Sequence, residues 1–222
     1  MKPSLRHGIQ IPQLPRALSA DAPATLGDQV EFTSAALARN DFGGQSGRGL
    51  IFEQVRGQGV VFQRTRLPQT RLVDVRFEGC DFSAADWEKT RWRRIEITRS
   101  RGLGWQLLEA DLENATIIDC NLENCVLAAS RLKNVRFEKC NLRGAILEQA
   151  ELTSVVFDDC DLTHADLRGA KLNTVDVRGS IIDALQASAA DLRGAIIDRA
   201  QAAQIAALFG LIVKDRDELL SD

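Results

Sequence analysis

The chain has 222 residues, of which 45% are hydrophobic and 27% charged, so it is long enough for one domain with a sizeable core. It has no run of eighteen apolar residues and no apolar signal region near its start, which argues against a membrane span and predicts a cytoplasmic location. An odd number of cysteines, five, favours reduced thiols over a disulfide framework, and a net charge of −3 does not suggest direct nucleic-acid binding.

The first segment, residues 1–29, contains four of the five prolines in the chain: Pro3, Pro12, Pro15 and Pro23. Proline fixes the backbone and removes an N–H donor, so this segment is predicted to be irregular. We expect it either to wrap the start of the following fold or to be mobile.

A five-residue register runs through the next part of the chain, residues 30–199. From Phe52 to Ile197 there are 30 positions whose number leaves remainder two on division by five, and 27 of them hold Leu, Ile, Val, Phe or Trp. The positions divisible by five between Leu50 and Ala195 are Ala, Cys, Ser, Thr or Val in 26 of 30 cases. A period of five fits neither a helix nor a strand alone. It predicts a coil with short flat sides, each of which buries one large and one small side chain.

All five cysteines occupy the small-residue positions of this register. Cys120 and Cys125 are consecutive positions of that class, and a buried cysteine behaves as a small hydrophobe. Because the spacing is not Cys-x-x-Cys and histidines are scarce, we expect neither a metal nor another cofactor here. Four thiols separated by multiples of twenty residues are predicted to form a ladder in the core: Cys80, Cys120, Cys140 and Cys160.

The sequences "ADLEN", "CNLEN", "CNLRG", "ADLRG" and "CDLTH" resemble the A(D/N)LXX repeat of the pentapeptide repeat family. This resemblance implies an all-β fold, a right-handed quadrilateral parallel β-helix with four repeats, or twenty residues, in each coil. Weaker matches such as "VEFTS" extend the register back to about Val30.

The segment "KTRWRRIEITRSRGLGW" at residues 89–105 places a belt of cations around one coil, including Arg91, Arg93 and Arg94. Such a belt is suited to phosphate groups, but it is equally consistent with a solvated face. Residues 1–110 carry 16 basic and 12 acidic residues, whereas residues 111–222 carry 12 and 19, so the second half is acidic.

Four carboxylates of the acidic half are candidates for partner binding: Asp158, Asp159, Asp161 and Asp166. They occupy outward positions on a convex rod without an evident cleft, which disfavours general acid–base catalysis. The two histidines, His7 and His164, have no nucleophile or metal-ligand partners in register. The sequence therefore predicts a protein that is not an enzyme.

The register fails after Ile197, and residues 200–222 are predicted to form a short capping α-helix, an extended segment and a tail. Apolar residues recur at helical spacing, and Gly210 is placed to end the helix. The helix either caps a monomer or forms a homodimer, for which the candidate interface residues are Ile205, Leu208, Phe209 and Ile212.

Length, apolar C-terminus and acidic second half resemble the topoisomerase-protecting branch of the family, which includes the MfpA and Qnr proteins. That resemblance implies a dimeric mimic of DNA that binds DNA gyrase or topoisomerase IV and protects it from quinolones or a gyrase poison. Qnr proteins carry loops that break the register, and no loop breaks it between residues 50 and 199 here. A scaffold or regulatory module for another protein partner is the alternative.

Overall fold

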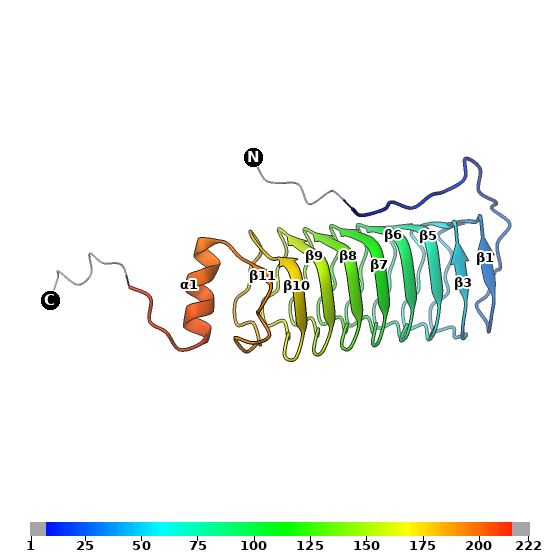
Figure 1. Cartoon of the computed structure of the whole chain (residues 1–222). Helices are drawn as coiled ribbons and strands as arrows, with labels where there is room; N and C mark the ends of the chain where they lie inside the picture. Colours follow the sequence, from blue (N-terminus) through cyan, green and yellow to red (C-terminus); the bar gives the residue numbers. More distant parts are fainter. Residues whose placement is uncertain (1–7, 215–222) are drawn as a thin grey trace.

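The computed structural model describes residues 8–214, so His7 and the last eight residues of the predicted C-terminal tail lie outside the described residues. The described chain winds into a parallel β-solenoid with one helix at its C-terminal end (Figure 1). The elements are β1 (Glu31–Thr33), β2 (Ala36–Ala38), β3 (Ile51–Glu53), β4 (Arg56–Gln58), β5 (Arg71–Glu78), β6 (Arg91–Thr98), β7 (Asp111–Ile118), β8 (Arg131–Glu138), β9 (Glu151–Asp158), β10 (Lys171–Asp176), β11 (Ala195–Ile196) and α1 (Arg199–Leu208).

Neighbouring coils pair in parallel with an offset of twenty residues. Leu112 lies opposite Leu132, for example, and the ladder continues in the order β1-β3-β5-β6-β7-β8-β9-β10-β11. Isolated bridges such as Asn121↔Asn141 extend the same offset to the remaining sides of the coil. The coil with short flat sides predicted from the five-residue register, and the parallel β-helix that the family resemblance implies, are therefore confirmed.

The large side chains of the register fill the inside of the rod. Between Phe32 and Leu167 every large apolar residue of this class is buried. Aromatic rings stack from one coil to the next, with centroids 4.7 Å apart for Phe32 and Phe52 and 5.1 Å apart for Phe137 and Phe157. Burial of such columns is the main source of stability in a stacked coil.

One pair of residues exchanges sizes within the register. Trp105 stands at a small-residue position and is buried, while Gly102 stands at a large-residue position. A Cβ on Gly102 would lie 3.0 Å from Cε3 of Trp105, so the indole occupies the space that a large residue at 102 would need. Glycine is thus required here by close approach of a side chain.

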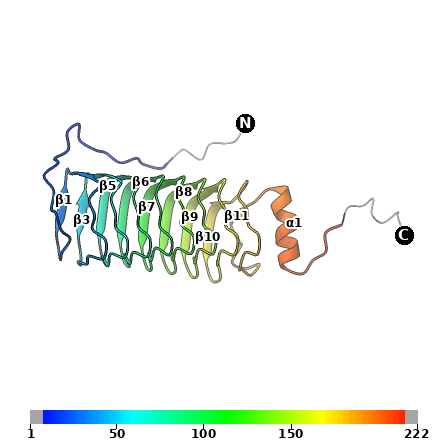
Figure 2. The ribbon, with the colours of Figure 1, turned by 180° about the vertical axis from the view of Figure 1, so that it is seen from behind.

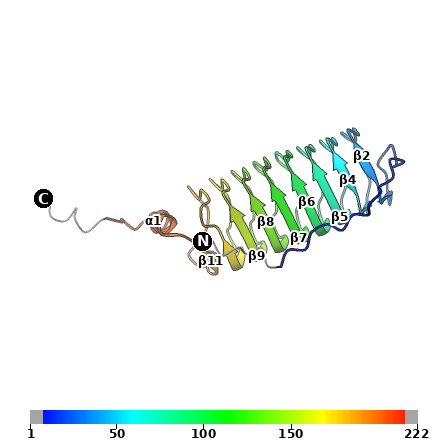
Figure 3. The same cartoon turned by 90° about the horizontal axis from the view of Figure 1, so that it is seen from above.

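The N-terminal segment is ordered in its described part and does two things. Ser19 pairs with Ala35 of the first coil, donating its N–H to Ser34 and accepting the N–H of Ala36. Residues before Ser19 turn back and run along the outside of the rod, where the three views place them beside the strands (Figures 1–3). The segment therefore both wraps the first coil and covers part of one edge.

The C-terminal helix α1 is attached to the last coil mainly through a polar contact. Asp198 caps its first turn, and the buried side chain of Gln201 donates to the carbonyl oxygens of Val177 (2.7 Å) and Ser180 (2.8 Å). The predicted C-terminal helix is present, and its Ile205 is half-buried against the core, whereas Leu208 is exposed. The helix ends before Gly210, whose φ of 76° suits glycine, as predicted.

Candidate protein-binding surface

Outward side chains form columns because each coil repeats the same positions twenty residues later. Opposite charges in successive coils are therefore direct neighbours. The least exposed pair between coils joins Arg94 of β6 to Asp74 of β5, with Nε 2.6 Å from Oδ1 and Nη2 2.7 Å from Oδ2. The hydrogen bonds from Arg94 hold the pKa of Asp74 below its usual value, against the effect of burial. Arg94 is thus a structural cation rather than part of a free basic surface.

The other cations of the predicted basic belt are also largely neutralised. Arg93 pairs with Glu113 at 3.0 Å, and Arg101 pairs with Asp81 at 2.9 Å. Arg99 pairs with Glu78, and Lys89 lies 3.8 Å from Glu109. The sequence analysis placed the cations of this belt around the outside of a coil, where the structure has them, but it missed the carboxylates that stand one coil away. This belt is a set of ion pairs, and a sequence comparison at intervals of twenty would have found them.

Arg91 is the exception, because within residues 8–214 its side chain has no hydrogen bond or ion pair. It lies directly opposite Arg71, which is also unpaired there. A shallow depression of about 300 Å³ on this side is lined by both arginines together with Leu72, Val73, Trp92, Arg93, Asp111 and Glu113. The unpaired positive charge of the belt is therefore confined to this depression.

Three of the four predicted partner-binding carboxylates bond to nearby cations. Asp158 accepts from Arg136 at 2.6 Å, Asp161 from Arg143 at 3.1 Å, and Asp166 from Arg168 at 2.6 Å. The hydrogen bonds from Arg168 lower the pKa of Asp166, so this carboxylate is ionised at neutral pH. Asp166 is also buried to a large extent, which makes it a poor contact for a partner.

Asp159 is exposed, and in the described part of the chain it has no ion pair. Two coils earlier, Asp119 occupies the equivalent position of its coil and is likewise exposed and unpaired there. Sequence reasoning missed Asp119, although its spacing of forty residues from Asp159 is the available signal. We define the acidic edge as six carboxylates on this side of the second half: Asp119, Glu123, Glu138, Asp158, Asp159 and Asp161. Three cations lie among them: Arg136, Lys139 and Arg143.

The cysteine ladder lies inside the rod. Cys80, Cys120, Cys140 and Cys160 are free and buried, with Ser100 filling the place between the first two. Their thiols donate to nearby backbone carbonyls, as Cys140 does to Ile117 at 3.4 Å. Burial raises the pKa of Cys80 to about 11 and of Cys125, on another side of the coil, to about 12. Cys80 and Cys125 are therefore protonated at neutral pH, and all five buried thiols serve as packing residues.

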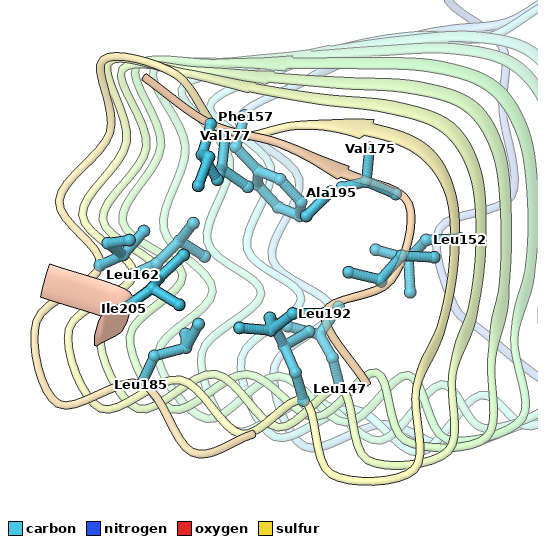
Figure 4. A pocket seen from close by; sticks show the side chains of 14 residues that line it. Leu147, Leu152, Phe157, Leu162, Val175, Val177, Leu185, Leu192, Ala195 and Ile205 are labelled. Carbon is cyan, nitrogen blue, oxygen red and sulfur yellow. The ribbon is translucent and has the colours of Figure 1, made fainter. Parts of the chain in front are cut away.

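The C-terminal end exposes apolar side chains that the rod does not cover. Ile205 contacts the last coils, whereas Leu208, Phe209 and Ile212 are 39%, 38% and 86% exposed. Leu211 and Val213 add to the same surface. Figure 4 shows the apolar gap inside the last coils, where Leu162, Leu192 and Ile205 point toward one another. Its volume of about 20 Å³ is too small for a ligand larger than water.

The structure offers no constellation for catalysis in the part that it describes. His164 is exposed at a corner, and no group of three His, Cys, Asp or Glu side chains suited to a metal occurs among residues 8–214. The one described helix is too short to cross a membrane. A stack of four-sided coils with a filled core and long outer columns defines a solenoid repeat protein.

The repeats match a known family over part of the chain. The family model for pentapeptide repeats matches residues 106–144 and 137–173 in eight copies. In residues 106–173 the chain is therefore similar to pentapeptide repeat proteins.

Comparison with solved structures finds other proteins of this kind. A trypsin-treated form of QnrB1, a plasmid-mediated fluoroquinolone resistance protein, is 21% identical with a TM-score of 0.44, and the match covers 85% of this chain and 99% of that chain. HetL, a pentapeptide repeat protein involved in heterocyst differentiation regulation in the cyanobacterium Nostoc, is 20% identical with a TM-score of 0.33 over 78% and 89%. The comparison with curated proteins finds no match.

Proposed function

We propose that this protein is a non-catalytic binding protein whose acidic edge occupies a cationic, DNA-binding surface of a type II topoisomerase. The observation that carries the proposal is the distribution of unpaired charge. Asp119 and Asp159 are exposed without ion pairs in the described chain, whereas Arg91 is the one cation of the basic belt without such a pair there. An electrostatic partner of the acidic edge is therefore cationic.

The choice of DNA gyrase or topoisomerase IV as the partner follows from the resemblance of the repeats to the topoisomerase-protecting branch. Protection from quinolones or from a gyrase poison, and a cytoplasmic location, belong to the same proposal. Because the acidic edge lies in the half next to α1, a homodimer joined through Leu208, Phe209 and Ile212 brings two acidic edges toward its centre.

The test is a gyrase supercoiling and cleavage assay with and without a quinolone, on wild type and on two variants. Asp119→Asn with Asp159→Asn removes the unpaired charges of the acidic edge and is expected to weaken the effect on gyrase at least about tenfold. Glu53→Gln removes one exposed carboxylate of the first half and serves as the matched control, with no loss expected.

The alternative function is a scaffold or regulatory module that uses its flat sides to bind a different protein. Two features favour it. The register is unbroken between residues 50 and 199, which leaves no inserted loop, and many outward charges are neutralised by ion pairs between successive coils. If wild type at micromolar concentration changes neither supercoiling nor cleavage, this alternative replaces the first.

A further inference from the structure

The outer edge of the rod already holds an extended peptide, namely the N-terminal segment of the chain itself. Gln13 donates its backbone N–H to Oδ1 of Asp74 at 2.8 Å, and Gln10 donates its own to Oδ1 of Asn114 at 3.2 Å. Figure 3 shows this segment following the edge of the strands. We call residues 8–16 the strap, and the column that it contacts the corner column.

The strap is packed as well as hydrogen-bonded. Pro12, between the two donors, is buried. Val73 stands at an outward position where the neighbouring coils carry Glu53 and Arg93, yet Val73 is only 8% exposed. Val73 is next to Asp74, which the strap contacts, so a buried apolar residue at an outward position there indicates that the edge is shaped for a peptide.

The spacing of the contacts explains why an extended chain fits. Asp74 and Asn114 are two coils apart, which is about 9.6 Å at the usual distance between strands. Gln10 and Gln13 are three residues apart, which is about 9 to 10 Å in an extended or polyproline II chain. A proline between the donors holds that conformation at a low entropic cost. Every second coil therefore presents an acceptor in step with every third peptide N–H.

The same column continues beyond the strap. Asn134, Ser154 and Thr174 occupy the equivalent corner, each with a positive φ as in Asp74 and Asn114. Within residues 8–214 the side chains of Asn134 and Ser154 have no hydrogen bond. The edge is a repeating array of acceptors, of which the described strap uses two.

We propose that the corner column is a binding site for extended peptides that carry a proline between two free backbone N–H groups three residues apart. The strap is its occupant within the chain, and a partner's segment of the same chemistry displaces the strap. Recognition comes from backbone N–H groups and one buried proline, so the site selects conformation and spacing more than side-chain identity.

The test uses a full-length variant whose strap lacks the two backbone N–H donors. Gln10→Pro with Gln13→Pro deletes both N–H groups and keeps an extended backbone. A labelled peptide with the sequence of residues 8–19, GIQIPQLPRALS, is titrated by fluorescence anisotropy into wild type and into this variant. Because the wild-type strap competes at a high effective concentration, we expect at least about tenfold tighter binding to the variant.

Two controls identify the site. In the double-proline background, Asn114→Gly removes one acceptor and suits the positive φ there, so it is expected to weaken peptide binding at least about tenfold. Asn134→Gly makes the same change one coil further on, outside the strap contacts, and is expected to have less than about twofold effect. Circular dichroism melts confirm that each variant is folded.

A labelled peptide that itself carries both proline substitutions is expected not to bind. Equal affinity of the unmodified peptide for wild type and for the double-proline variant overturns the proposal, and so does an absence of binding to the folded variant at millimolar peptide. Equal losses with Asn114→Gly and Asn134→Gly also contradict it, because the donors and acceptors would then be out of step.

Discussion

Arg94 donates hydrogen bonds to both carboxylate oxygens of Asp74, which lies one coil earlier. The same carboxylate accepts the backbone N–H of Gln13 from the strap. The side chain of Asp74 is 8% exposed and that of Arg94 is 20% exposed. The buried carboxylate of Asp74 therefore connects the N-terminal strap to the outer face of the rod, because it binds both Gln13 and Arg94.

Replacing Arg94 is therefore expected to be costly. Arg94→Leu leaves a buried carboxylate without its counter-charge, which costs about 3 kcal/mol or more of unfolding free energy. Arg101→Leu is the matched control, since Arg101 also pairs with an aspartate one coil earlier but its own side chain is 72% exposed. An exposed pair contributes about 0 to 1 kcal/mol. Urea unfolding measures both, and similar losses would contradict the importance of burial.

The strap is expected to detach in acid. The folded-state pKa of Asp74 lies below 3.8, chiefly because of the hydrogen bonds from Arg94. A lowered pKa means that the stabilisation is complete above the unfolded pKa and is lost as pH falls through the folded one. Hydrogen exchange at Gln13 is therefore expected to be slow at neutral pH and to accelerate relative to model peptides only as the pH falls through the lowered pKa of Asp74, below 3.8. In Asp74→Asn this acceleration should be absent.

The register predicts unequal costs for neighbouring residues of β8. Leu132 is 1% exposed, so Leu132→Arg buries an unpaired charge and is expected to cost several kcal/mol or to prevent folding. Lys133 is outward and lies 3.2 Å from Glu113, so Lys133→Gln is expected to cost less than about 1 kcal/mol. Thermal melts compare them, and comparable shifts would refute the register.

The pair with Glu113 also changes what we expect of a charge reversal. From the sequence alone, Lys133→Glu looks neutral, below about 0.5 kcal/mol. In the structure the new carboxylate faces Glu113 across the ladder, and like charges directly opposite are destabilising by up to about 1 kcal/mol. The reversal should therefore cost more than Lys133→Gln.

These cases show what the sequence could predict. The register placed Leu132 inside and Lys133 outside because a period of five resolves inward from outward positions. The pairing of Asp74 with Arg94 was also predictable, since the two differ by twenty residues, but only once charges are compared between coils. The contact between Gln13 and Asp74 had no such signal, because the strap lies outside the repeat. The sequence did not predict the attachment of α1 through Gln201, because an amide side chain in an Ala-rich helix is normally expected to face solvent.

The thiols are expected to be unreactive in the folded protein. Burial raises the pKa of Cys80 to about 11 and of Cys125 to about 12, so both are protonated at neutral pH and shielded from reagents. Iodoacetamide should label fewer than one cysteine per chain at pH 8 and all five in urea. Rapid labelling without denaturant, or stoichiometric zinc in the purified protein, would contradict the packing role of the ladder.

The final prediction links the C-terminal surface to the proposed function. Phe209 is 38% exposed and follows α1, so Phe209→Asp is expected to leave the melting temperature nearly unchanged. If Leu208, Phe209 and Ile212 form a dimer interface, the added charges meet there and convert a dimer into monomers in light scattering. Topoisomerase inhibition should then weaken, because each monomer presents only one acidic edge. Leu103→Asp, at 48% exposure in the middle of the rod, is the matched control for self-association and should not change the mass. A dimer that survives Phe209→Asp rules out this interface. A dimer with a Kd of about 1 μM would be nearly complete at about 100 μM, so a wild type that is monomeric at that concentration removes the dimer from the proposal.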